Sequence, residues 1–383
     1  MGEEINILIT GDFNGGNRIE SLIQSGEYNL IYNDFFPVIQ NNDIAITNLE
    51  GPVTTATSAI SKTGPTIKNP IKTIEALKYA GFNLLTLANN HIMDYGAKGL
   101  EETFEKIKEN NLDFVGAGKN SANASEIFYK SIGDKTFAFV NMAENEWSTT
   151  QGDNPGANPL NPIVNYYSIL EAKKAADYVF VIIHGGHEMY PLPSPRMKET
   201  YRFFIEAGAS AVIGHHSHCY SGYETYKGMP IFFSLGNFVF DPGFKQSADW
   251  SFGYAVLFVI SERKMTFKIL PYKQNKDRLG VWKLSQDEEQ DFFEKIERLN
   301  NIIKDDSLLK REFDDFAKKS QKRFYSYMEP HSMKILHFLQ RKKLFPYFYK
   351  KKKRLYLTNI IRCEAHRDVF LKILQNENWN SER

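Results

Sequence analysis

The sequence predicts an α/β protein, and two regular features carry that prediction. Short apolar runs rich in Val, Ile, Leu and Phe recur between residues 5 and 273, and many of them end at a glycine. Amphipathic stretches with helical spacing lie between these runs. Strands that alternate with helices are typical of folds in which helices cover a sheet.

The first part of the chain predicts four strands and three helices. A polar, Thr-rich loop at 53–66 interrupts the alternation, and Gly81 is placed to end the second helix. The expected strands are 5–11, 43–51, 83–89 and 112–118, and the expected helices are 30–41, 69–82 and 96–111.

The second part continues the alternation of strands and helices up to about residue 273, and charged helices follow from about residue 286. Its expected strands are 136–143, 178–186, 210–216 and 230–237, its helix is 196–209, and a hairpin joins 252–260 to 265–273. From about residue 286 the chain reads as charged helices. We therefore expect one large domain over residues 1–285 and a helical, basic extension over residues 286–383.

Composition indicates a soluble globular chain without an obvious partner. The hydrophobic share is 42%, the charged share is 24% and the net charge is +1, so the overall charge does not favour nucleic acid. Two distant cysteines, Cys219 and Cys363, indicate a reducing compartment. The opening residues lack a secretory signal, and no apolar run approaches the ~18 residues of a membrane span. We expect a cytoplasmic protein.

Polar side chains follow the expected strands at the points where they end. In an open α/β sheet, ligands bind outside the carboxyl ends of the strands, so these side chains are expected to meet at one edge. The cluster "GHHSH" at 214–218 alone supplies three imidazoles. The residues at strand ends are Asp12, Asn48, Glu50, Asn89, Asn90, His91, His184, His187, His215, His216, His218 and Asn237.

A mixed set of oxygen and imidazole donors predicts a divalent metal site. Such a shell suits Mn²⁺, Fe or Zn²⁺ better than Ca²⁺, and one or two ions are expected. For any single histidine the alternative is a hydrogen-bonded polar residue at a strand end, and Asn in "LANNH" is also a turn former. Three imidazoles within four positions, together with His184 and Asp12, favour the metal interpretation.

Six blocks carry a resemblance to a known family. In order and spacing they resemble the calcineurin-like metallophosphoesterase superfamily, and more closely its bacterial capsule-synthesis (CapA-type) branch, which is linked to poly-γ-glutamate capsules. The resemblance spans residues 5–272 and implies a four-layer α/β/β/α sandwich, with 1–285 as the catalytic domain. The blocks are "GDFN" (11–14), "NLEGPVT" (48–54), "NNHIMDYGAKGLEET" (89–103), "HGGHE" (184–188), "GHHSH" (214–218) and "SLGNF" (234–238).

The resemblance assigns a role to each matching residue. The implied metal ligands are Asp12, Glu50, Asn90, His184, His216 and His218. His91 matches the histidine that protonates the leaving group, and Asp94 takes the place of an acidic neighbour that orients it. The superfamily has a histidine where this chain has Asn14, so the first metal is expected to lack one ligand.

Other polar residues near these blocks are candidates for substrate contact or for supporting the ligands. The alternative for Lys62 and Arg196 is a plain solvated charge. The candidates are Asn14, Asn48, Lys62, His187, Glu188, Arg196, His215 and Asn237.

The segment "QRKKLFPYFYKKKKRLYL" at 340–357 stands apart from the resemblance. It interleaves basic residues with Leu, Phe and Tyr, which suits an anionic membrane surface or an anionic polymer, with nucleic acid less favoured. The alternative is a solvated helix face with a core stripe. We expect Lys350, Lys351, Lys352 and Lys353 to contribute most to such a contact, which would place the protein at the inner face of the membrane.

Two classes of function follow. The first is a metal-dependent phosphoesterase that acts in capsule or surface polysaccharide biosynthesis on a phosphorylated or polymer-linked substrate. The second is a non-catalytic capsule-assembly protein with a structural or vestigial metal site, which the missing histidine at position 14 favours. The complete set of other ligands, with His91 beside them, favours the enzyme.

Overall fold

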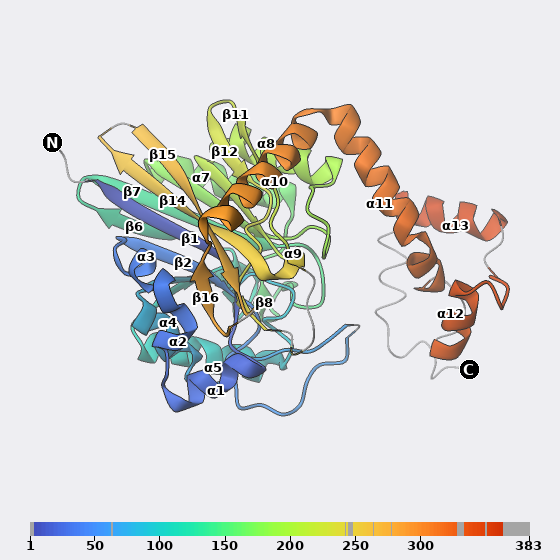
Figure 1. The fold of residues 1–383 in the computed structure, drawn as a ribbon, viewed down its shortest axis with the longest axis horizontal. Helices are drawn as coiled ribbons and strands as arrows, with labels where there is room; N and C mark the ends of the chain where they lie inside the picture. Colours follow the sequence, from blue (N-terminus) through green and yellow to red (C-terminus); the bar gives the residue numbers. More distant parts are fainter. Residues whose placement is uncertain are drawn as a thin grey trace. The chain divides into compact units, whose positions relative to one another are not determined.

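The computed structural model describes residues 4–62, 64–241, 243, 248–262, 264–276, 278–327, 333–348 and 351–362. The chain divides into two units, Met1–Arg311 and Glu312–Arg383. The first unit contains the sheets and most of the helices (Figure 1). The predicted metal-binding and catalytic residues all belong to it.

The first sheet has parallel strands in its centre and an antiparallel edge. Its order is β16-β15-β14-β1-β2-β3-β4, and β13 also pairs with β1. Strands β1, β2, β3 and β4 run parallel, which brings their carboxyl ends to one edge. The bounds are β1 Ile5–Asn14, β2 Ile44–Leu49, β3 Leu84–Thr86, β4 Asp113–Val115, β13 Asn237–Phe240, β14 Phe252–Ser261, β15 Lys264–Gln274 and β16 Val281–Lys283.

The second sheet also has a parallel centre. Its order is β11-β12-β10-β9-β7-β6, with antiparallel strands at both edges. A small two-stranded sheet pairs β5 (Ala117–Gly118) with β8 (Gly156–Ala157). The bounds of the six strands are β6 Phe128–Ile132, β7 Lys135–Ala143, β9 Tyr178–His184, β10 Ala211–His215, β11 Tyr223–Tyr226 and β12 Met229–Phe232.

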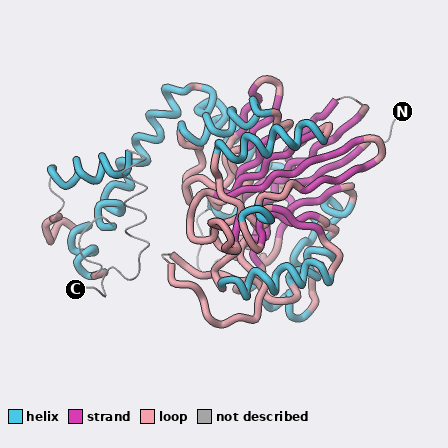
Figure 2. The backbone as a smooth tube through the Cα atoms, turned by 180° about the vertical axis from the view of Figure 1, so that it is seen from behind, coloured by secondary structure: helices cyan, strands magenta, loops and turns pink. Residues whose placement is uncertain are grey.

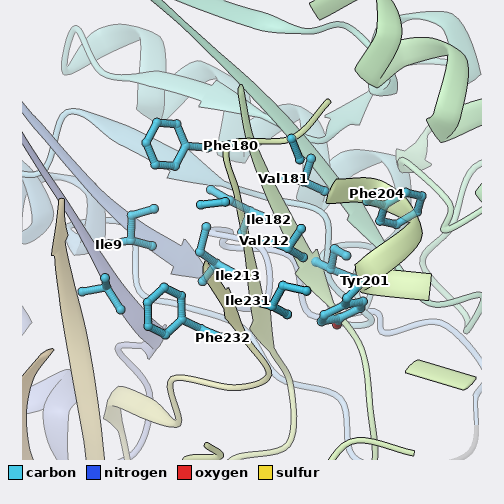
Figure 3. Packing of buried hydrophobic residues seen from close by; sticks show 14 of the residues in the cluster. Ile9, Phe180, Val181, Ile182, Tyr201, Phe204, Val212, Ile213, Ile231 and Phe232 are labelled. Atoms are coloured by element: carbon cyan, nitrogen blue, oxygen red, sulfur yellow. The ribbon is translucent and has the colours of Figure 1, made fainter. Parts of the chain in front are cut away.

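The two sheets share a buried core. Successive residues of a strand point to opposite faces, so Ile7 and Ile9 of β1 join the cluster shared with the second sheet, whereas Leu8 joins the cluster beneath the helices. Aromatic rings link the sheets, since Phe180 of β9 meets Phe258 of β14 edge-on at 5.0 Å. Figure 3 shows Ile9 among residues of the second sheet.

Helices cover the outer faces of both sheets (Figure 2). The first group packs on the first sheet through the cluster that contains Leu8, and in the second group Tyr201 of α8 stacks on Phe233 at 5.7 Å. The α/β class and the layered sandwich are thereby confirmed. The first group is α1 Arg18–Ser25, α2 Asn29–Tyr32, the 3₁₀ turn η1 Asn33–Phe35, α3 Phe36–Gln40, α4 Thr73–Ala80 and α5 Gly96–Glu109; the second includes α7 Pro162–Ala175 and α8 Pro195–Ala207.

Local signals explain where these helices begin and end. Helix α8 begins after Ser194, whose hydroxyl accepts from the Met197 N–H, and it ends at Gly208 with φ +119°. The sequence pattern missed α7, because apolar side chains lie on several of its sides: Ile163 is exposed whereas Ile169 is buried. The short helices α6 (Ser121–Ala124) and α9 (Ala248–Ser251) lie in connections.

The strand expected at 230–237 is two strands. Strand β12 ends at Phe232, and β13 begins at Asn237 in the other sheet. Gly236 between them has φ +76°, a conformation that glycine adopts without strain. A Cβ at Gly11 would lie 1.9 Å from the Gly236 carbonyl oxygen, so both glycines permit the close approach that brings Asn237 beside Asp12.

Charged helices follow residue 286, as expected. Helix α10 (Gln286–Lys304) packs Phe292, Ile296 and Leu299 into the core of the first unit. Helices α11 (Asp306–Tyr327), α12 (Lys334–Arg341) and α13 (Lys351–Arg362) follow. The domain boundary at residue 285 stays a prediction. Within the described part of the chain, none of the helices combines the length and the apolar character needed to cross a membrane.

Candidate metal centre

The carboxyl ends of strands from both sheets bring the predicted ligands together. In the first sheet, Asp12 of β1 stands opposite Asn48 of β2 and Asn237 of β13. In the second sheet, His184 ends β9 directly opposite His215, which ends β10. The hydrogen-bond register, fixed by the apolar pattern of the strands, therefore places these polar side chains at one edge.

Three donor atoms form the tightest part of the cluster. His184 Nε2 lies 3.1 Å from Asn90 Oδ1 and 3.1 Å from His216 Nδ1. Ligands about 2.0–2.2 Å from a common ion are roughly 3 Å apart, so this spacing suits adjacent positions of a coordination shell. Asn90, His184 and His216 fit one divalent cation.

Glu50 lies next to this group and lacks any hydrogen-bonded partner for its carboxylate among the described residues. It is fully buried, and its Oε1 lies 3.8 Å from both His91 Nε2 and His218 Nε2. Ligand atoms of Asp12, Glu50 and His184 lie within 4.8 Å of one another. An ionised carboxylate buried without partners is costly, and a bound cation would remove that cost. The donor set therefore fits a divalent metal.

The electrostatics of the site depend on burial and on the neighbouring charges. Burial raises the pKa of Glu50 well above its usual range, and the nearby carboxylates of Asp12 and Glu188 raise it further. For Asp12, burial has the same tendency, but the contact with His215 and the nearby His184 outweigh it and lower the pKa. Burial lowers the pKa of His184, which favours the neutral imidazole that metals bind.

Other residues hold the ligands in position. Asn237 accepts from His218 Nδ1 at 2.9 Å, which leaves His218 Nε2 facing Glu50. Asn48 donates to Asp12 Oδ1 at 2.8 Å. His215 Nδ1 lies 3.2 Å from the same oxygen, although its angle is not that of a hydrogen bond. Asn48, His215 and Asn237 thus contact the predicted ligands Asp12 and His218.

The backbone at the histidine cluster is unusual. His216 has φ +91° and His218 has φ +54°, a region that residues with a Cβ enter at some cost. This conformation lets both side chains reach the site although only one residue separates them. It also lets the His216 N–H donate to Asp12 Oδ2 at 3.1 Å.

The side-chain amide of Asn14 forms hydrogen bonds with the main chain. Its Nδ2 donates to the Glu50 carbonyl at 3.0 Å, and its Oδ1 accepts from the Gly16 N–H at 3.0 Å. Both ends of the amide are occupied, so Asn14 positions the backbone of Glu50. It does not replace the histidine ligand that the resemblance implies at this place.

His91 forms a second functional group beside the metal ligands. Its Nδ1 lies 2.6 Å from Asp94 Oδ2, and its Nε2 faces Glu50. Lys62 Nζ donates to Asp94 Oδ1 at 2.6 Å and to the Asn90 carbonyl at 3.3 Å. Lys62 is therefore a buried partner of the His91–Asp94 pair, and the solvated-charge alternative is wrong for it.

The remaining candidates lie at the rim. Arg196 is 61% exposed and pairs with Glu144 at 2.5 Å, and Glu144 also accepts from the Gly186 N–H. Glu188 is exposed, yet close enough to affect Glu50. The ring of His187 lies edge-on to Tyr190 at 6.3 Å. Arg196 is therefore engaged by Glu144 at the rim.

Glu146 is a site residue that the sequence analysis missed. Its Oε2 accepts from Asn90 Nδ2 at 3.3 Å, and its Oε1 lies 3.7 Å from His216 Nε2. These contacts turn Asn90 Oδ1 and His216 Nδ1 toward His184. The signal is present in the sequence, because Glu146 follows the carboxyl end of the expected strand 136–143.

Replacing Glu146 with Gln is expected to weaken divalent-metal binding by about 10- to 100-fold, as the loss of an outer-shell partner typically does. The substitution removes the ionised carboxylate 3.7 Å from His216 Nε2 but keeps the side-chain volume. Titration calorimetry of metal-free protein with Mn²⁺ or Zn²⁺ measures the effect. Glu188→Gln, which removes an exposed carboxylate at the same rim, should change the affinity much less. Equal losses in both variants would mean that Glu146 contributes only its charge.

The fold and the site together define a class of protein. It is a layered α/β/β/α sandwich that gathers carboxylate, amide and imidazole donors at the carboxyl ends of its strands. Residues 6–242 match the model of the family described as bacterial capsule synthesis protein PGA_cap, so the chain belongs to that family.

Named relatives agree with this membership. The chain is 33% identical to the capsule biosynthesis protein CapA of Bacillus anthracis, over 64% of this chain and 62% of that protein. It is 32% identical to the PGA biosynthesis protein CapA of Bacillus subtilis, over 62% of this chain and 64% of that protein. In both cases the matched region is less than two thirds of the relative's length.

A solved structure described as a novel phosphatase from Mycoplasma pneumoniae is more distant. It covers 77% of this chain and 99% of its own, at 16% identity and a TM-score of 0.43. We draw no argument about activity from a likeness this weak.

Proposed function

We propose that this protein is a metal-dependent phosphoesterase that acts in capsule or surface polysaccharide biosynthesis. One observation carries the proposal: buried Glu50, without hydrogen-bonded partners, lies beside the Asn90–His184–His216 group, with His91 and Asp94 next to it. A structural metal site would require the donors but not the His91–Asp94 pair at their side.

The residues would divide the work between metal binding and proton transfer. One or two divalent ions, with Mn²⁺, Fe or Zn²⁺ suited to these donors, would supply a Lewis acid and an activated water. The ligands would be Asp12, Glu50, Asn90, His184, His216 and His218.

His91 would act as the general acid. Asp94 accepts from its Nδ1 and stabilises the protonated ring, so that Nε2 can hold the proton for a leaving alkoxide. Lys62 fixes the second oxygen of Asp94 and thereby the orientation of the pair.

The pathway and the substrate class rest on the family. Its relatives are named for capsule and PGA biosynthesis. We propose a phosphorylated or polymer-linked substrate, with a phosphate ester at its reacting end.

A non-catalytic role in capsule assembly remains the second candidate. The observation that favours it is Asn14, which stands where the resemblance implies a histidine and whose amide hydrogen-bonds the main chain at both ends. In that case a single ion would bind Asn90, His184 and His216, and it would serve stability alone.

The deciding experiment combines metal analysis with an activity assay. Elemental analysis of the purified protein is expected to find bound Mn, Fe or Zn, and the matching ion should restore hydrolysis of p-nitrophenyl phosphate or its diester to metal-free protein. Bound metal without hydrolysis of any phosphoester would favour the assembly role. Failure to bind any of these ions would contradict the phosphoesterase and would leave the assembly role with a vestigial site.

A further inference from the structure

The segment 333–362, here called the basic segment, has an unusual charge pattern. It contains no Asp or Glu, whereas α10 and α11 before it mix both signs. Its ten basic residues are Lys334, Arg341, Lys342, Lys343, Lys350, Lys351, Lys352, Lys353, Arg354 and Arg362. Lys350 lies outside the described residues, while Lys351 and Lys353 begin α13 and are exposed. A charge run this one-sided is typical of a surface that binds polyanions.

Apolar side chains of the same segment are also exposed. The aliphatic ones, Ile335, Leu344, Leu355 and Ile361, have exposed fractions of 57–73%. Phe338 and Phe348 are about half exposed, and Lys342 lies over the Phe338 ring at 5.9 Å. Exposing these apolar side chains to water is energetically unfavourable. A surface that combines them with cations therefore suits a partner that is both anionic and apolar.

We propose that the basic segment docks the protein on an anionic lipid bilayer. The lysines and arginines would meet the headgroups, and the exposed aliphatic and aromatic side chains would enter the boundary with the acyl chains. Helix α13, with 12 residues, is about 18 Å long, well short of the ~30 Å hydrocarbon layer, so the segment lies on the membrane and does not span it.

The exposed aliphatic side chains favour lipid over nucleic acid. Nucleic-acid surfaces combine cations with stacking aromatic rings, and exposed Leu or Ile contributes little to phosphate or base contacts. Leu344, the most exposed of these aliphatic residues, lies directly after the basic triplet Arg341–Lys343. Docking does not depend on phosphoesterase activity, so the two proposals can fail separately.

The test is sedimentation of the full chain with vesicles. The wild-type protein should sediment with phosphatidylcholine vesicles that contain phosphatidylglycerol, and high salt should release it from them. It should not sediment with vesicles of phosphatidylcholine alone. Changing the exposed lysines Lys342, Lys343, Lys351 and Lys353 together to Gln should weaken binding by about 10²- to 10³-fold, since each cation near such a surface contributes up to a factor of about five. The double variant Leu344→Ser, Phe348→Ser keeps every charge and should also weaken vesicle binding.

A matched control removes the same charge elsewhere. Lys78, Lys108, Lys119 and Lys174, which are exposed in the first unit, changed together to Gln, should leave vesicle binding intact. Circular dichroism and thermal unfolding establish that each variant is folded. The proposal is overturned if wild type does not sediment with anionic vesicles at low salt, if the control set loses binding equally, or if the segment binds poly(U) RNA but no vesicle.

Discussion

Glu50→Gln is expected to stabilise the metal-free protein and to abolish its stabilisation by divalent metal. The buried carboxylate lacks hydrogen-bonded partners among the described residues, and a neutral amide of the same size relieves a penalty of about 1–3 kcal/mol. In wild type, an ion present at 100 times its dissociation constant should add about 2.7 kcal/mol to the free energy of unfolding. Thermal and urea unfolding with and without Mn²⁺ or Zn²⁺ measure both effects.

The stability difference between Glu50→Gln and wild type should depend on pH. The pKa of Glu50 is raised in the folded protein above its ordinary value of 4.5, so the folded state binds the proton more tightly than the unfolded state. The carboxyl group therefore costs metal-free wild type stability as the pH rises above about 4.5. Gln does not titrate, so the advantage of Glu50→Gln over wild type should be small at low pH and should grow toward neutrality.

Glu224 provides the matched control for this prediction. It is equally a buried glutamate, but Arg202 donates to its two oxygens at 2.9 and 2.6 Å. Glu224→Gln should therefore destabilise the protein with and without metal, and it should leave the response to metal intact. If metal-free Glu50→Gln loses as much stability as Glu224→Gln, the Glu50 carboxylate is already compensated by a partner and does not need a cation.

The fold was largely predictable because its strands are buried on both faces. Continuous apolar runs such as 178–183 in β9 mark central parallel strands, and the glycine after α8 marks a helix end. The predictions failed where tertiary contacts decide the structure. Helix α7 has no single apolar face, and the split of 230–237 depends on Gly236 meeting Gly11, which is distant in sequence.

The metal site was predictable to the extent that strand ends share an edge. Parallel strands deliver Asp12, Glu50 and His184 to the same place, and the apolar pattern alone indicates where each strand stops. Which atoms face one another was not predictable from the apolar pattern. The resemblance implied Asp94 as the partner of His91, but Lys62, which donates to the same carboxylate, comes from a loop that no periodic pattern describes.

His91→Ala is expected to slow phosphoester hydrolysis by about 10²- to 10⁴-fold while metal content stays unchanged. This prediction rests on the proposed activity. His91 Nε2 lies 3.8 Å from Glu50 Oε1, and Asp94 binds Nδ1 of the same ring. We therefore expect His91 to adjoin the Asn90–His184–His216 group without being a ligand itself. Steady-state kinetics and elemental analysis of the same preparation separate the two roles. A fall in bound metal that parallels the fall in rate would make His91 a ligand.

The leaving group distinguishes a general acid from a residue that only shapes the site. An alkyl phosphate expels a basic alkoxide that needs a proton, whereas p-nitrophenolate departs with little help. The loss in His91→Ala should therefore be largest for the alkyl ester and small for p-nitrophenyl phosphate. Asp94→Asn should show the same selectivity with a smaller loss, because it weakens the support of the protonated ring. Arg196→Ala, which removes an exposed side chain at the rim of the same site, is the control and should show no such selectivity. Equal losses on both substrates in His91→Ala would refute the assignment of His91 as the general acid.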